Sequence, residues 1–186
     1  LPAYWFVNAS SYDGKKDVYY ALINNFPGRE ESTLVQQLLM VDFSDTAVGQ
    51  ATPKPQAVLV PIVDNVFKGQ LQFVAFSLRF VFAAGINLQT NVAYVTLVDA
   101  VTGETSDLGF QASEVTEVGP LVVHSNHGTT SIPMNLFVKH GENSWSLYEL
   151  QFNTNVGAIT VNQHVEDYAG DDYKNFAAGT VAFNEN

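Results

Sequence analysis

The sequence predicts one all-β domain spanning residues 1–186, an antiparallel β-sandwich of the jelly-roll or immunoglobulin-like type. First, short apolar segments alternate with turn signals roughly every 8–12 residues, as in sandwiches and barrels. Second, no amphipathic helical segments separate these strands, which argues against a parallel α/β fold. Third, one long apolar run, residues 66–82, is suited to the centre of a sheet.

The run from Val66 to Phe82 reads VFKGQLQFVAFSLRFVF. Its apolar side chains fall on odd positions up to Phe73 and on even positions from Phe76 onward. Strand side chains alternate between two faces, so a change of parity on one face requires an extra residue. We therefore expect one long central strand with a β-bulge or a sharp bend near residues 74–75.

The first third of the chain predicts four more strands. Residues 3–8 and 17–23 flank a turn at 10–16 that contains Asp-Gly, and this pattern indicates a hairpin. Residues 33–43 fit either a short helix capped by Ser32 or a buried strand, and we favour the strand. The strand at 58–63 contains Pro61, which suits an edge or a bulge.

After the central run, strands alternate with polar turns to the end of the chain. We expect loops at 113–119, which Gly119-Pro120 would close, and at 166–175, which is acidic. The predicted strands are 91–99, 105–112, 121–124, 132–140, 145–152, 158–165 and 180–183.

Charge and composition exclude several classes of function. The chain has 19 acidic and 8 basic residues and a net charge of −11, which argues against binding to nucleic acids or anionic lipids. It has no cysteine, so thiolate chemistry, Cys-ligated metals and disulfides are excluded. The sequence has no apolar run of 18 residues, which argues against a transmembrane helix.

Two features favour a location outside the cell or on the surface of a particle. The chain begins at Leu1 and not at methionine, so we expect that a signal peptide has been removed. No basic residue lies between Arg79 and Lys139, which leaves trypsin-like proteases little to cut. The competing explanation for the second feature is that strands disfavour lysine.

The acidic loop 166–175 is the first candidate ligand site. Its carboxylates, chiefly Asp167, Asp171 and Asp172, are hard oxygen donors of the kind that calcium prefers, although their spacing does not match an EF-hand. Tyr168 and Tyr173, with Asn126 from the loop 125–131, could instead stack on and hydrogen-bond to a glycan. A solvated acidic loop without any ligand is the alternative.

Two histidines, His124 and His127, lie three residues apart and form a second candidate site. Imidazole is a common ligand of transition metals, and His140 or His164 could supply a third ligand. The alternative is that these are solvent-exposed loop histidines. No nucleophile elbow or phosphate-binding loop is present, so we assign no catalytic residue and expect no cofactor apart from the candidate ions.

The functional expectation is a non-enzymatic structural subunit of an extracellular layer, filament or capsid. The segments 4–7 and 180–183 are strand-forming and lie near the two termini, where they could add to the sheet of another copy. They could equally pair within their own domain. The alternative function is a carbohydrate-binding module, whose binding calcium could assist. The second alternative is a metal-dependent β-barrel enzyme.

Overall fold

The computed structural model describes residues 5–14, 16–25, 35–44, 55–63, 71–75, 77, 79–87, 89–124, 130–141 and 144–166. In these ranges the protein is all-β and forms three four-stranded sheets, an arrangement consistent with a β-sandwich. Nothing in these ranges is a helix of the length and apolarity that a membrane span requires.

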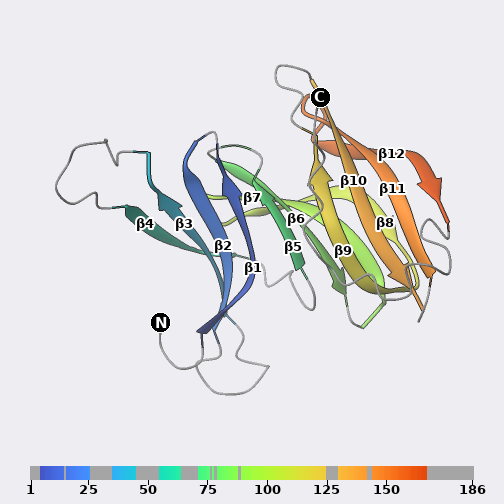
Figure 1. Ribbon diagram of the computed structural model, residues 1–186, viewed down its shortest axis with the longest axis horizontal. Coiled ribbons are helices and arrows are strands. Elements are labelled where there is room, and N and C mark those ends of the chain that lie inside the picture. Colours follow the sequence, from blue (N-terminus) through green and yellow to red (C-terminus); the bar gives the residue numbers. More distant parts are fainter. Residues whose placement is uncertain are drawn as a thin grey trace. The chain divides into compact units, whose positions relative to one another are not determined.

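The N-terminal sheet has the strand order β1-β2-β3-β4 and is antiparallel throughout. Its strands are β1 (Trp5–Asp13), β2 (Val18–Asn25), β3 (Val35–Asp42) and β4 (Gln56–Pro61). Figure 1 shows β4 at the outer edge of this sheet, beside β3.

The middle sheet has the order β5-β6-β7-β8. Its strands are β5 (Leu71–Ala75), β6 (Phe80–Asn87), β7 (Val92–Asp99) and β8 (Thr105–Ala112). Its best-buried strand is β6, in which every side chain from Val81 to Ile86 is buried.

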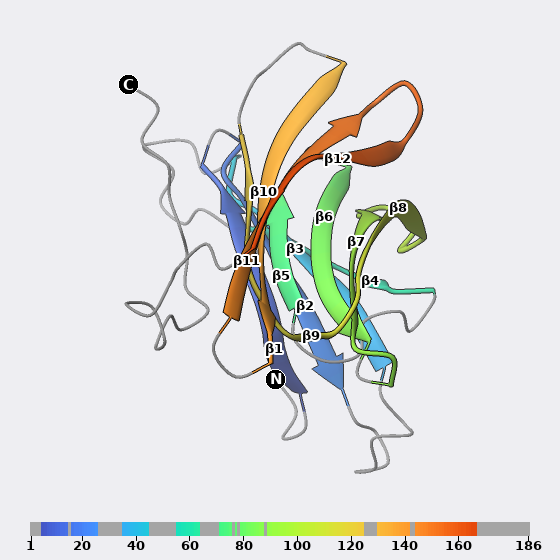
Figure 2. The same ribbon diagram turned by 90° about the vertical axis from the view of Figure 1, so that its right-hand side faces the viewer.

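The C-terminal sheet has the order β12-β11-β10-β9 and is antiparallel. Its strands are β9 (Val115–Val123), β10 (Ser131–His140), β11 (Ser144–Asn153) and β12 (Ala158–Val165). Figure 2 shows that β10 and β12 are curved and not flat, as is expected of strands in a twisted sheet.

Contacts along the chain divide it into two compact units. Unit 1 comprises Leu1–Val66, Phe73–Phe82 and Leu97–Ser106, and unit 2 comprises the remaining residues. The expectation of one domain over 1–186 remains a prediction.

Both units contain buried apolar side chains. In unit 1, Tyr20 and Leu22 alternate along β2 and are buried on one face of the N-terminal sheet. Leu38 of β3 lies opposite Leu22 and is buried on the same face. The Tyr20 hydroxyl donates to the Ser77 carbonyl oxygen at 3.2 Å, and burial, helped by the charges of Asp13 and Asp42, raises the pKa of Tyr20 to about 12. In unit 2 the buried apolar side chains include Met134, Leu136, Leu150 and Phe152.

The prediction of a single long strand through residues 66–82 was wrong. β5 ends at Ala75 and β6 begins at Phe80, and a tight turn separates them. The Ser77 hydroxyl oxygen accepts hydrogen bonds from the N–H groups of Arg79 (3.2 Å) and Phe80 (2.9 Å), and Ser77 N–H donates to the Phe80 carbonyl at 2.8 Å. The change of parity in the sequence therefore marks a reversal of the chain between two strands and not a bulge.

The predicted loop at 113–119 was also wrong, because β9 already begins at Val115. The chain turns at Glu114, which has a φ of 60°. Gly119 lies inside the strand, where an added Cβ would come within 2.8 Å of Cζ3 of Trp145. The glycine therefore permits close packing under an aromatic ring, and does not form a turn.

The other tested strands exist where they were predicted, but the first strand continues to Asp13, so residues 10–13 of the predicted turn are strand. The first two strands form the expected hairpin, and the ambiguous segment 33–43 is strand β3. The segment containing Pro61 is the edge strand β4, as predicted from its proline. The predicted strand 180–183 lies outside the described residues.

Candidate functional site: the free edge of β4

Most residues that the sequence singled out lie outside the part of the chain that the structure describes. These residues are Asn126, His127, Asp167, Tyr168, Asp171, Asp172 and Tyr173. The calcium, glycan and two-histidine sites therefore remain predictions.

The described histidines do not gather around one point. His124 follows the end of β9, and its N–H donates to the Pro133 carbonyl at 3.0 Å. His140 pairs with Val115 at the opposite end of β9, roughly 30 Å from His124 at the rise of an extended strand. His164 on β12 stacks on the Tyr148 ring, with centroids 4.1 Å apart.

In the described ranges no three His, Asp or Glu side chains are grouped closely enough to hold a metal ion. Because His127 lies outside the described ranges, the two-histidine site and its third ligand stay predictions.

The N-terminal strand β1 is an edge strand, as expected of a terminal strand, and Phe6, Val7 and Tyr12 are about half exposed on it. However, its pairing with β2 shifts register between Val7 and Ala9, so the strand is bulged. Such irregularity is a common device against pairing with another chain.

Carboxylates also flank β1. The Tyr12 hydroxyl donates to Oδ1 of Asp17, and this hydrogen bond, with burial and the charges of Asp17 and Asp13, raises the pKa of Tyr12. A strand of another copy paired with this edge would lie beside these carboxylates, and the negative charge of that copy would oppose the pairing.

The opposite edge strand, β4, pairs with β3 without a register shift, and the carboxylate beside it is Asp42, opposite Gln56 at the start of the strand. Its four consecutive side chains from Gln56 to Leu59 are all exposed, so this segment is uncovered on both faces of the sheet. Val58 is 46% exposed and Leu59 is 38% exposed. No residue of β4 is charged.

The hydrogen-bond pattern shows which backbone groups of β4 point away from β3. Ile62 N–H donates to the Gln36 carbonyl at 2.9 Å, which continues the register in which Gln37 faces Pro61. Since hydrogen-bonded pairs alternate in an antiparallel ladder, the even-numbered residues of β4 bond to β3. The N–H and C=O groups of Ala57 and Leu59 therefore point outward.

The prolines of this segment are odd-numbered like Ala57 and Leu59, so their backbone groups also point away from β3. Pro55 and Pro61 have no N–H to donate, so neither costs a hydrogen bond to β3. Beyond Pro61 the outward edge is occupied, because Val63 N–H donates to the Gly103 carbonyl at 3.1 Å. We use the name β4 edge for the remaining segment, Gln56–Val60.

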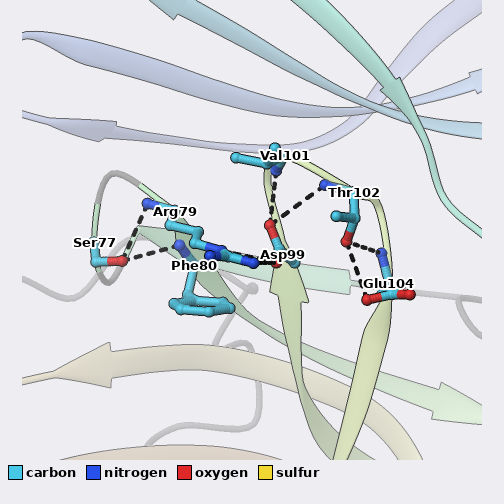
Figure 3. Close-up of polar contacts among 7 residues, drawn as sticks. All are labelled: Ser77, Arg79, Phe80, Asp99, Val101, Thr102 and Glu104. Atoms are coloured by element: carbon cyan, nitrogen blue, oxygen red, sulfur yellow. Dashed lines mark hydrogen bonds and ion pairs between the residues drawn. The ribbon is translucent and has the colours of Figure 1, made fainter.

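The turn that covers the end of the β4 edge is held by an ion pair (Figure 3). Nε and one terminal nitrogen of Arg79 lie 2.9 and 2.8 Å from Oδ2 of Asp99. Oδ1 of Asp99 accepts hydrogen bonds from the N–H groups of Val101 and Thr102. The carboxylate thus has partners on both oxygens and anchors the turn; it is not free to act as a catalytic base.

The ionisation of Asp99 follows from these contacts. Burial opposes the charged form, but the hydrogen bond from Arg79, the two backbone N–H donors and the charge of Arg79 outweigh it and lower the pKa of Asp99. Asp99 therefore remains charged over the usual pH range.

Gly103 brings the same turn against β4. It has a φ of 76°, and an added Cβ would lie 1.8 Å from the Pro61 carbonyl oxygen. Only glycine fits this approach, so Gly103 determines where the β4 edge stops.

This site offers main-chain donors and acceptors between exposed apolar side chains, which is the chemistry of strand addition. Reasoning from the sequence identified Pro61 as an edge residue but did not identify Val58 and Leu59 as exposed. The available signal was an uncharged segment, QAVLV, bounded by prolines at equal parity.

Comparisons with known proteins gave no relative for this chain. No family model matches it, and neither a curated protein nor a solved structure matches at the threshold applied.

Proposed function

We propose that the protein is a non-enzymatic structural subunit that self-associates through β-sheet edges, as in an extracellular layer, filament or capsid. In this proposal the chain is a jelly-roll or immunoglobulin-like sandwich, secreted or carried on a particle. The observation that carries the proposal is the uncharged β4 edge, whose side chains are exposed on both faces of the sheet.

Soluble proteins commonly protect such edges with lysine, proline or bulges. β1 carries a bulge, and β4 is bounded by prolines but has no charged residue between them. The unprotected length is therefore short and defined, which suits a specific contact better than indiscriminate aggregation.

Charge supports the same choice of surface. Two copies of a chain with net charge −11 repel each other, and this repulsion is weakest where the meeting surfaces carry no charge of their own. No residue of the β4 edge is charged, and Asp42 lies beside it only at Gln56, whereas β1 itself ends in Asp13 and lies beside Asp17.

The test is a pair of lysine substitutions compared by sedimentation velocity. Val58→Lys places a charge on the β4 edge and is expected to weaken self-association by about tenfold or more, because pairing would bury the ammonium group. Val156→Lys is the matched control, since Val156 is 73% exposed in the turn between β11 and β12. Equal association of the two variants would remove the β4 edge as the contact.

A further inference from the structure

We infer that the β4 edge pairs antiparallel with the β4 edge of a second copy, with Val58 facing Val58 on a two-fold axis. This inference rests on the proposed function and specifies its contact. The partner is another copy of this chain, and the contact is closed and not propagating.

The register follows from the outward backbone groups. If Val58 lies on the axis, Ala57 faces Leu59 of the partner subunit, and the reverse pair forms by symmetry. Both pairs are hydrogen-bonded pairs, because Ala57 and Leu59 point outward, and together they form four N–H···O=C bonds. Every outward N–H and C=O group of these two residues is then used.

Moving the axis by one residue also gives four N–H···O=C bonds, but two of them then use a proline carbonyl as the acceptor, and Ala57 and Leu59 no longer satisfy each other. An axis at Ala57 would place Leu59 opposite Pro55, and an axis at Leu59 would place Ala57 opposite Pro61. The proline in each case supplies no N–H, so one carbonyl on each strand would lose its donor.

Side-chain sizes fit the same register. The small Ala57 lies opposite the large Leu59 of the partner subunit, on one face of the extended sheet. On the other face, Val58 meets Val58 in a non-hydrogen-bonded pair, where side chains approach most closely. None of the β4 residues that meet in this register is charged.

The contact cannot lengthen. In this register Pro61 faces Pro55 at each end, and neither residue has an N–H. The turn at Gly103 occupies the outward edge beyond Pro61. A contact of this length is small and weak by itself, so dimerisation through it requires high concentration or a second contact.

Single-cysteine variants test this inference directly, because the chain contains no cysteine. We use Val58→Cys with glutathione disulfide as the oxidant, and Val161→Cys, 50% exposed on β12, as the matched control. A residue on the axis has its Cβ about 4.5–5.5 Å from its symmetry mate, close to disulfide geometry. We expect Val58→Cys to form covalent dimers about tenfold faster or more than the control.

A second measurement uses the unmodified protein, so that the inference does not depend on the folding of a variant. Hydrogen exchange of the Ala57 and Leu59 amides is expected to slow as protein concentration rises.

The outcomes separate the two proposals. Association with no faster cross-linking of Val58→Cys, and with no concentration-dependent protection at Ala57 and Leu59, would overturn the two-fold contact and leave the proposed function standing. A monomer at every concentration would overturn both.

Discussion

At the scale of single residues, Asp99 and Gly103 decide where the β4 edge ends. Asp99 is 7% exposed and accepts hydrogen bonds on both carboxylate oxygens. Gly103 brings the turn into contact with the Pro61 carbonyl through a backbone conformation that other residues rarely adopt. Neither residue belongs to β4, yet both limit its exposed length.

Removing the Asp99 carboxylate should destabilise this turn. We expect Asp99→Ala to lower the free energy of unfolding by about 1–3 kcal/mol, since the N–H groups of Val101 and Thr102 lose their acceptor. Asp99→Asn keeps an oxygen acceptor and should cost less. Urea denaturation of the three proteins measures the difference, and equal stability of the alanine variant and the wild type would contradict an anchoring role.

The pH dependence of the same variants has a defined sign. Because the folded-state pKa of Asp99 is lowered, its ionisation stabilises the protein above the unfolded-state pKa. That stability is lost as pH falls through the folded-state pKa. The advantage of the wild type over Asp99→Asn should therefore diminish on acidification.

Gly103 offers a comparison between two glycines with the same backbone conformation. Gly103 and Gly109 have φ values of 76° and 77°, but an added Cβ would meet Pro61 only at Gly103, and nothing lies within 4 Å at Gly109. Gly109→Ala should cost about 1–2 kcal/mol from strain, and Gly103→Ala should cost more by at least a similar amount. Thermal denaturation compares them, and equal losses would show that the close approach does not matter.

At the scale of strands, local patterns predicted most elements, because alternation and turn residues are local. The first hairpin was predictable from Asp13-Gly14, and the edge position of β4 from Pro61. The turn between β5 and β6 was not, since the segment around Ser77 is apolar and the turn depends on one hydroxyl accepting two backbone N–H groups.

The candidate site was less predictable than the strands. Exposure of Val58 and Leu59 depends on which strand of the sheet is outermost, and strand order is not encoded in local alternation. Similarly, the sequence predicts a turn at Gly119, because a local pattern does not reveal that this glycine packs against Trp145. That contact joins β9 to β11, which are far apart in the sequence.

At the scale of the whole molecule, self-association must overcome a net charge of −11 on each copy. This repulsion acts over distances comparable to the Debye length, which salt shortens from about 30 Å at 0.01 M to about 8 Å at 0.15 M. The β4 residues of the proposed contact are uncharged. Added salt should therefore strengthen association, whereas a contact made of opposite charges would weaken.

The molar mass of the unmodified protein in solution tests the central claim most directly. Light scattering over a range of protein concentrations, at low and at moderate salt, should show a mass that rises above the 20.4 kDa of one chain. The rise should begin at a lower concentration when salt is added. A constant mass of one chain at every concentration and both salt levels would contradict self-association as the function of this protein.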